Sequence, residues 1–96
     1  MIRHSVLFSF KAVTEPALVQ AFFKAAAALA RIPGVQQFEI LRQISKKNGF
    51  DYGISMEFNN LEAYDHYSNH PDHQLFIQDY WLPFVADFLE IDYEKL

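Results

Sequence analysis

The sequence predicts an α+β domain in which helices cover one face of a four-stranded antiparallel sheet. Four segments alternate apolar and polar residues with the period of two that is typical of strands. The stretches after the first and third of these segments instead repeat apolar residues with helical spacing. The chain has 96 residues, and no linker or low-complexity segment interrupts it, so we predict a single domain over residues 1–96.

The first half of the chain is expected to form a strand, a helix and a second strand. Residues 2–11 alternate as the first strand. Thr14-Glu15-Pro16 predicts the start of a helix with the threonine as its N-cap, and Pro33-Gly34 predicts its end. Residues 35–44 are expected to form the second strand, and Asn48-Gly49 in the polar turn that follows indicates a hairpin.

The second half of the chain repeats this layout with one extra helix. Residues 52–58 alternate as the third strand, and Asn59-Asn60 is expected to cap a helix over residues 61–70. A proline breaks that helix and suits the first turn of another, over residues 72–82. The last strand is expected over residues 88–94. The order β-α-β-β-α-α-β contains the split βαβ arrangement of the ferredoxin-like βαββαβ fold.

The predicted sheet has a second face that one copy of the chain leaves uncovered. The helix over residues 72–82 is apolar around most of its circumference, so it must contact a core, a cavity or a partner on more than one side. Together with a hydrophobic content of 51%, this predicts a ligand cavity, a homodimer with two sheets packed face to face, or both. The uncovered face is mixed in character and contains Ser5, Leu7, Ser9, Leu41, Gly53 and Ser55.

Composition disfavours several classes of protein. The net charge is −4 and the eight Lys and Arg residues are mostly scattered singly, so no nucleic-acid partner is expected. No apolar run approaches the ~20 residues of a membrane span, so we expect a soluble chain without a membrane partner. The lack of cysteine excludes thiolate nucleophiles and iron–sulfur clusters and fits a cytoplasmic location. Three glycines cannot build a phosphate-binding loop, and we expect no cofactor.

The segment from Tyr67 to His73 is the main candidate for chemistry, because two histidines flank a proline at a helix break. Three interpretations stay open. In the first, His70 or Asn69 caps a helix end and His73 is partly exposed. In the second, His66, His70 and His73 bind a metal, although the proline interrupts their helical register, and our prediction is no metal. In the third, His73 is a general base in a pocket, with Tyr67 as its orienting or polarising partner.

Other residues have simpler interpretations. His4 lies on the strand face that points toward the helices, where a histidine is more often a hydrogen-bonded core residue than a catalyst. Trp81 is interpreted as a core aromatic rather than part of a cofactor site. Asp92 and Glu94 are interpreted as solvated residues at the edge of a strand.

The sequence resembles the stress-responsive α/β barrel (Dabb) family over nearly its full length. The specific part of the resemblance is the N-terminal histidine together with a His-Pro-x-His element. The segments that carry it are Ile2-Arg3-His4-Ser5-Val6-Leu7-Phe8, Ile32-Pro33-Gly34-Val35, Tyr52-Gly53-Ile54-Ser55-Met56-Glu57-Phe58, Tyr64-Asp65-His66-Tyr67-Ser68-Asn69-His70-Pro71-Asp72-His73 and Phe88-Leu89-Glu90-Ile91-Asp92-Tyr93.

The resemblance implies a dimeric α+β barrel in which the sheets of two copies face one another. The family includes a plant polyketide cyclase that makes olivetolic acid by aldol chemistry without a cofactor. Similarity to that enzyme implies that His73 is the general base, that Tyr67 is its partner and that His4 is a pocket residue. A further pocket histidine of that enzyme falls near Tyr52, so the chain departs from it there.

Two functions therefore compete. The first is a small-molecule enzyme or binder of cyclase or lyase type that uses neither metal nor cofactor and takes a small apolar or β-keto ligand. In it, His73 abstracts a proton α to a carbonyl group and Tyr67 holds His73 or the substrate oxygen. The residues expected to line the site are His4, Tyr52 and Trp81. The second is a stress-associated dimeric structural or ligand-binding protein without turnover.

Overall fold

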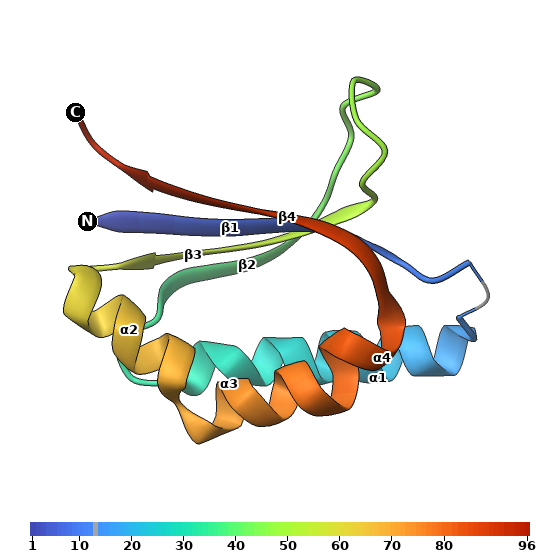
Figure 1. Cartoon of the computed structure of the whole chain (residues 1–96), viewed down its shortest axis with the longest axis horizontal. Coiled ribbons are helices and arrows are strands. Elements are labelled where there is room, and N and C mark those ends of the chain that lie inside the picture. Colours follow the sequence, from blue (N-terminus) through green and yellow to red (C-terminus); the bar gives the residue numbers. More distant parts are fainter. Residues whose placement is uncertain (13) are drawn as a thin grey trace.

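The computed structural model describes residues 1–12 and 14–96, which form a four-stranded antiparallel sheet with all the helices on one face (Figure 1). The strand order is β2-β3-β1-β4, so the first strand is central and the last strand lies at an edge. This arrangement confirms the predicted ferredoxin-like α+β fold. The strands are β1 (Ile2–Phe10), β2 (Gln36–Arg42), β3 (Tyr52–Phe58) and β4 (Val85–Glu94).

The helical layer is built from two regions of the chain that pack side by side under the sheet (Figure 1). The second region is nearly continuous: α3 passes into the π-helical segment η2 and then into α4, where Pro83 precedes the start of β4. None of the helices in the described part of the chain is both long and apolar enough to cross a membrane. The segments are α1 (Pro16–Ala28), η1 (Leu29–Arg31), α2 (Leu61–Asn69), α3 (Pro71–Phe76), η2 (Ile77–Trp81) and α4 (Leu82–Phe84).

The helix boundaries test the capping predictions. Asn60 caps α2 as expected, since its side-chain oxygen accepts a hydrogen bond from the backbone N–H of Ala63 at 2.9 Å. The prediction that Thr14 caps α1 is wrong: its hydroxyl donates back to the carbonyl of Lys11 at 2.8 Å, and Glu15 occupies the N-cap without a side-chain bond. Gly34 ends this helical region with a φ of +93°, a conformation that favours glycine.

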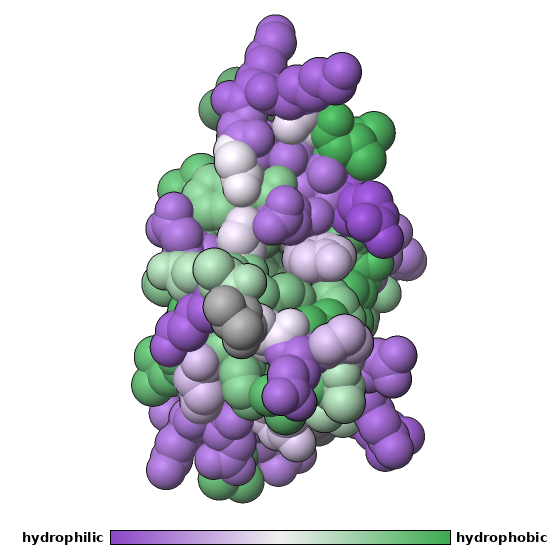
Figure 2. Space-filling view, turned by 90° about the vertical axis from the view of Figure 1, so that its right-hand side faces the viewer, coloured by the Kyte–Doolittle hydropathy of each residue, from purple (hydrophilic) through white to green (hydrophobic). Residues whose placement is uncertain are grey.

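The β2–β3 hairpin is confirmed, but its connection is longer than the Asn-Gly pair suggests. Residues 43–51 lie outside both strands, and the side chain of Gln43 donates to the carbonyl of Phe50 at 2.7 Å. The side chain of Asn48 accepts from the backbone N–H of Phe50, so it closes a local turn within the longer loop. Figure 2 shows the end of the molecule from which this loop projects, with hydrophilic side chains at its tip.

The core lies between the sheet and the helices. The strand residues that were expected to meet the helices do so, and Phe8, Met56 and Phe58 are fully buried together with Phe22 of α1. The opposite sheet face is uncovered in a single copy of the chain (Figure 1). Large apolar side chains are exposed on this face, which is unusual for a sheet face in contact with water, namely Leu41, Leu89 and Tyr93.

Candidate functional site

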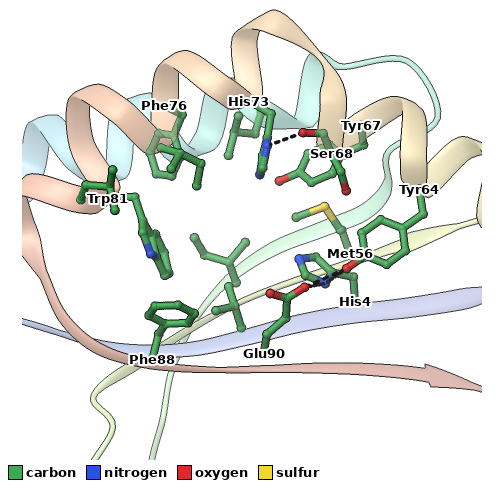
Figure 3. Close-up of a pocket in the computed structure, with 15 residues that line it drawn as sticks. His4, Met56, Tyr64, Tyr67, Ser68, His73, Phe76, Trp81, Phe88 and Glu90 are labelled. Atoms are coloured by element: carbon green, nitrogen blue, oxygen red, sulfur yellow. Dashed lines mark hydrogen bonds and ion pairs between the residues drawn. The ribbon is translucent and has the colours of Figure 1, made fainter.

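A cavity of about 260 Å³, partly open to solvent, lies between the sheet and the helices α2 and α3 and is slightly smaller than the ~300 Å³ at which ligand pockets usually begin (Figure 3). One end is aromatic, with Trp81 from η2 and Phe88 from β4. The other end is polar and contains the two predicted histidines. The lining residues are His4, Val6, Leu29, Ile54, Met56, Tyr64, Tyr67, Ser68, His73, Phe76, Ile77, Trp81, Leu82, Phe88 and Glu90.

His73 projects from the first turn of α3 into this cavity (Figure 3). Its Nδ1 lies 3.1 Å from the backbone carbonyl of Ser68, an atom that can only accept, so Nδ1 carries the proton and donates. Burial lowers the pKa of His73 below 6.5, with a smaller contribution from the nearby His4. His73 is therefore neutral at pH 7, and its free Nε2 offers a lone pair to a molecule in the cavity.

Tyr67 lies on the buried side of α2, and the Tyr67 and His73 rings have centroids 4.6 Å apart. Burial raises the pKa of Tyr67 above its ordinary value of 10, so the hydroxyl stays protonated at neutral pH. No residue in the described part of the chain forms a hydrogen bond with this hydroxyl. Tyr67 can therefore donate a hydrogen bond to a ligand oxygen beside the His73 base.

His4 is buried in the wall of the cavity, and its partners fix its tautomer. Its Nδ1 lies 2.6 Å from Oδ1 of Asp92 and 2.9 Å from the hydroxyl of Tyr64. Because an ionised carboxylate only accepts, Nδ1 must carry a proton, and Nε2 is the nitrogen left for a ligand. Asp92 is exposed on the edge strand, as interpreted, but it also orients His4, a role that the strand pattern did not indicate.

Tyr64, Glu90 and Asp92 form a hydrogen-bonded group around His4 that the sequence analysis missed. The Tyr64 hydroxyl lies 3.0 Å from Oε1 of Glu90 and 2.9 Å from Oδ2 of Asp92, and it can donate to either carboxylate. Burial and these two carboxylates raise the pKa of Tyr64. The strand period could have indicated the two carboxylates. Glu90 and Asp92 alternate with Phe88 along β4, so all three side chains lie on the helix-facing side of that strand.

Trp81 lines the cavity as predicted for a ligand-contacting residue, but Tyr52 does not. Tyr52 lies on β3 and packs against Phe8, Phe10 and Phe23, with ring centroids 5.1–5.8 Å apart. The expected place of Tyr52 in the pocket therefore needs correction. It faces the helices as predicted, yet at the far end of the strand, where aromatic rings fill the space.

The histidines considered as metal ligands do not converge. His70 caps α3 through Nδ1, which accepts from the backbone N–H of Asp72, and His66 lies beside it on α2. His73 points the other way, into the cavity. Within residues 1–12 and 14–96, the group able to hold a metal is instead His4, Glu90 and Asp92, whose ligand atoms lie within 4.8 Å of one another.

The lowered pKa of His73 predicts a pH-dependent stability. The unfolded chain binds a proton at His73 at a higher pH than the folded chain does, so the free energy of unfolding falls as the pH drops through 6.5. His73→Gln cannot bind this proton, so its stability lacks this pH dependence. In urea unfolding at about pH 7.5 and about pH 5.5, the free energy of unfolding of His73→Gln relative to that of the wild type should therefore be higher at the lower pH. An unchanged difference, or the same gain in the exposed His66→Gln control, would contradict the prediction.

These features define a small ferredoxin-like α+β protein with a partly open cavity that presents two histidines and a tyrosine hydroxyl to which none of the described residues is hydrogen-bonded. The chain belongs to the stress responsive A/B barrel domain (Dabb) family, because residues 2–95 match that family. A search of curated proteins gave no match.

Solved structures support this placement. A Dabb-family protein with a ferredoxin-like fold from Mesorhizobium loti is 46% identical, with a TM-score of 0.92 over 99% of this chain and 96% of that chain. A dimeric ferredoxin-like protein of unknown function from Thermobifida fusca is 22% identical, with a TM-score of 0.82 over 96% and 88%. A hydroxynitrile lyase from Passiflora edulis is 14% identical, with a TM-score of 0.85 over 96% and 90%. The last two similarities concern the fold.

Proposed function

We propose that this protein binds a small, largely apolar carbonyl compound and abstracts a proton from the carbon next to the carbonyl group, without a cofactor. The observation that carries this proposal is the pairing of His73 and Tyr67 in one cavity. His73 offers a neutral Nε2 as proton acceptor, and Tyr67 offers a protonated, unpartnered hydroxyl. A base and a donor side by side are what enolate formation requires.

The proposed step uses only groups in the cavity. His73 Nε2 takes the α-proton as the carbon–hydrogen bond breaks, and the electron pair moves onto the carbonyl oxygen. The Tyr67 hydroxyl donates a hydrogen bond to that oxygen and stabilises its negative charge. His4 lies on the same polar side, with a His4–Tyr67 ring distance of 6.3 Å, and its Nε2 lone pair can accept a hydrogen bond from a hydroxyl group of the substrate. Return of the proton from His73 to the carbon ends the cycle; alternatively, the enolate carbon attacks a second carbonyl carbon, and the oxygen of that carbonyl takes the proton from His73.

Exchange of the α-protons for deuterium tests this function directly. Acetophenone is incubated with the protein in D₂O, and loss of its methyl signal is followed by proton NMR, with free histidine at equal concentration as the background. We expect exchange well above background, together with ligand-induced shifts of cavity residues. Binding without exchange would make the protein a non-catalytic ligand-binding protein, and the absence of both would refute a function at this cavity.

We also propose that the protein is a homodimer whose subunits pack through their uncovered sheet faces. On that face Leu7 pairs with Leu89 across β1 and β4, and the exposed Leu41 and Tyr93 extend the apolar surface. Contiguous apolar side chains on an exposed face are typical of a protein–protein interface. The Thermobifida fusca protein of the same fold is described as dimeric, which agrees with this proposal.

Leu89→Asp is expected to convert the dimer into a monomer at micromolar concentration, because it places two symmetry-related charges inside an apolar interface. Sedimentation velocity measures the change. The matched control is Leu61→Asp, which adds the same charge at an exposed leucine at the start of α2, in the helical layer. A wild-type monomer, or a Leu89→Asp dimer, would refute the proposed interface.

A further inference from the structure

We propose that the cavity selects uncharged ligands and that Glu90 is the residue that excludes anions. This inference rests on the proposed function and narrows its substrate class. It favours neutral carbonyl compounds, such as ketones and esters, over carboxylates, including free β-keto acids.

The described residues that line the cavity provide no permanent positive charge. Among the described residues that line it there is no Lys or Arg, and Glu90 is the one acidic side chain. Arg3 belongs to the same central strand as His4 but points to the opposite sheet face, where it pairs with Glu57 at 2.8 Å. A ligand carboxylate would therefore leave water without gaining a permanently charged partner, and carboxylates buried in proteins are normally paired.

The polar end of the cavity holds more negative than positive charge. Oε1 of Glu90 lies 3.9 Å from Nδ1 of His4, and Asp92 lies behind it at 2.6 Å from the same nitrogen. Even a protonated His4 can balance only one of these two carboxylates. The second cavity histidine, His73, adds no charge, because burial keeps it neutral at pH 7.

Glu90 is held in the wall of the cavity, at the polar end. It projects from β4 toward the helices and accepts a hydrogen bond from the Tyr64 hydroxyl at 3.0 Å, which limits its freedom to turn away (Figure 3). Trp81 and Phe88 occupy the opposite end and suit the apolar part of a ligand. The oxygen of a bound carbonyl compound is thus directed toward the end where Glu90 lies.

A matched pair of ligands tests the inference. Methyl 3-benzoylpropionate and 3-benzoylpropionate share the phenyl ketone but differ in charge on the ketone side of the molecule, which faces Glu90, and their affinities can be measured by NMR titration. For like charges about 6 Å apart at a partly exposed site, we expect the ester to bind at least about tenfold more tightly than the carboxylate. In Glu90→Gln, which keeps a hydrogen-bond acceptor for Tyr64, we expect the preference to fall to about threefold or less.

Glu94→Gln is the control, because it removes the same charge from the exposed end of the same strand, outside the cavity. It should leave the preference unchanged. Equal binding of both probes to the wild type, or the same preference in Glu90→Gln as in the wild type, would overturn the inference and leave the proposed function standing. Failure of both probes to bind the wild type would refute the proposed function and the inference with it.

Discussion

His73→Asn is expected to slow the exchange of α-protons by about 10²–10⁴-fold, the usual contribution of a positioned general base. Asparagine keeps a polar side chain of similar reach, but its amide nitrogen cannot accept a proton. The variant should still bind the ketone, since Trp81, Phe88 and the rest of the lining are intact. The exchange rate under saturating ketone, measured by proton NMR, separates this loss from a loss of binding.

Two comparisons make this prediction specific. His66→Asn makes the same change at an exposed histidine on α2 and should exchange at the wild-type rate. Tyr67→Phe removes only the hydroxyl and should lower the exchange rate while leaving the base in place. If His73→Asn exchanges as fast as the wild type while remaining folded, His73 is not the base.

The fold could be predicted because most strands alternate cleanly. β3 was expected over residues 52–58 and forms Tyr52–Phe58, since its apolar side faces the helices and its other side carries small and polar residues. β2 was less well defined. Gln37 has a φ of +50°, and the pairing register shifts between Gln36 and Glu39, so the strand begins with an irregularity that alternation does not reveal.

The site could be predicted only in part, because in β4 the polar side of the alternating strand faces the helices and the apolar side does not. Leu89, Ile91 and Tyr93 form the more apolar side of this strand, which suggests the core, yet they lie on the uncovered sheet face. The side with Glu90 and Asp92 faces the helices and bonds to His4 and Tyr64. The helices cover only one face of this sheet, but the other face is apolar too. Apolar residues in β4 therefore do not identify the side that faces the core of one subunit.

Local chemistry explains the other differences. His73, Tyr67, His4 and Trp81 converge because strand alternation and helix spacing direct all of them to one layer. Tyr52 also faces that layer, but it lies too far along β3 to reach the cavity. Periodicity gives the face of a strand and does not give the position along it. His70 is the histidine to which the helix-capping interpretation applies, and its caps at the α2–α3 junction hold His73 in the first turn of α3.

Phe8→Ala is expected to lower the free energy of unfolding by about 3–5 kcal/mol, a large part of the ~5–15 kcal/mol that stabilises a typical domain. Phe8 is fully buried near the end of β1, an inner strand of the sheet, and its ring packs against Phe22 at 5.5 Å and Trp81 at 5.1 Å between centroids. Truncation removes these contacts, and neither the central strand nor α1 can move in to fill the space. Urea unfolding at a fixed protein concentration measures the loss, since the proposed dimer would make stability concentration-dependent.

Phe88→Ala provides the matched comparison, because Phe88 pairs directly with Phe8 across β1 and β4 and also contacts Trp81. Phe88 remains 52% exposed, so its removal opens the cavity wall to water and leaves no closed void. We expect it to cost less than half as much as Phe8→Ala. Equal losses would mean that the helices do not pack tightly on β1, and the His73-lined cavity on which the proposed chemistry depends would then lose its structural basis.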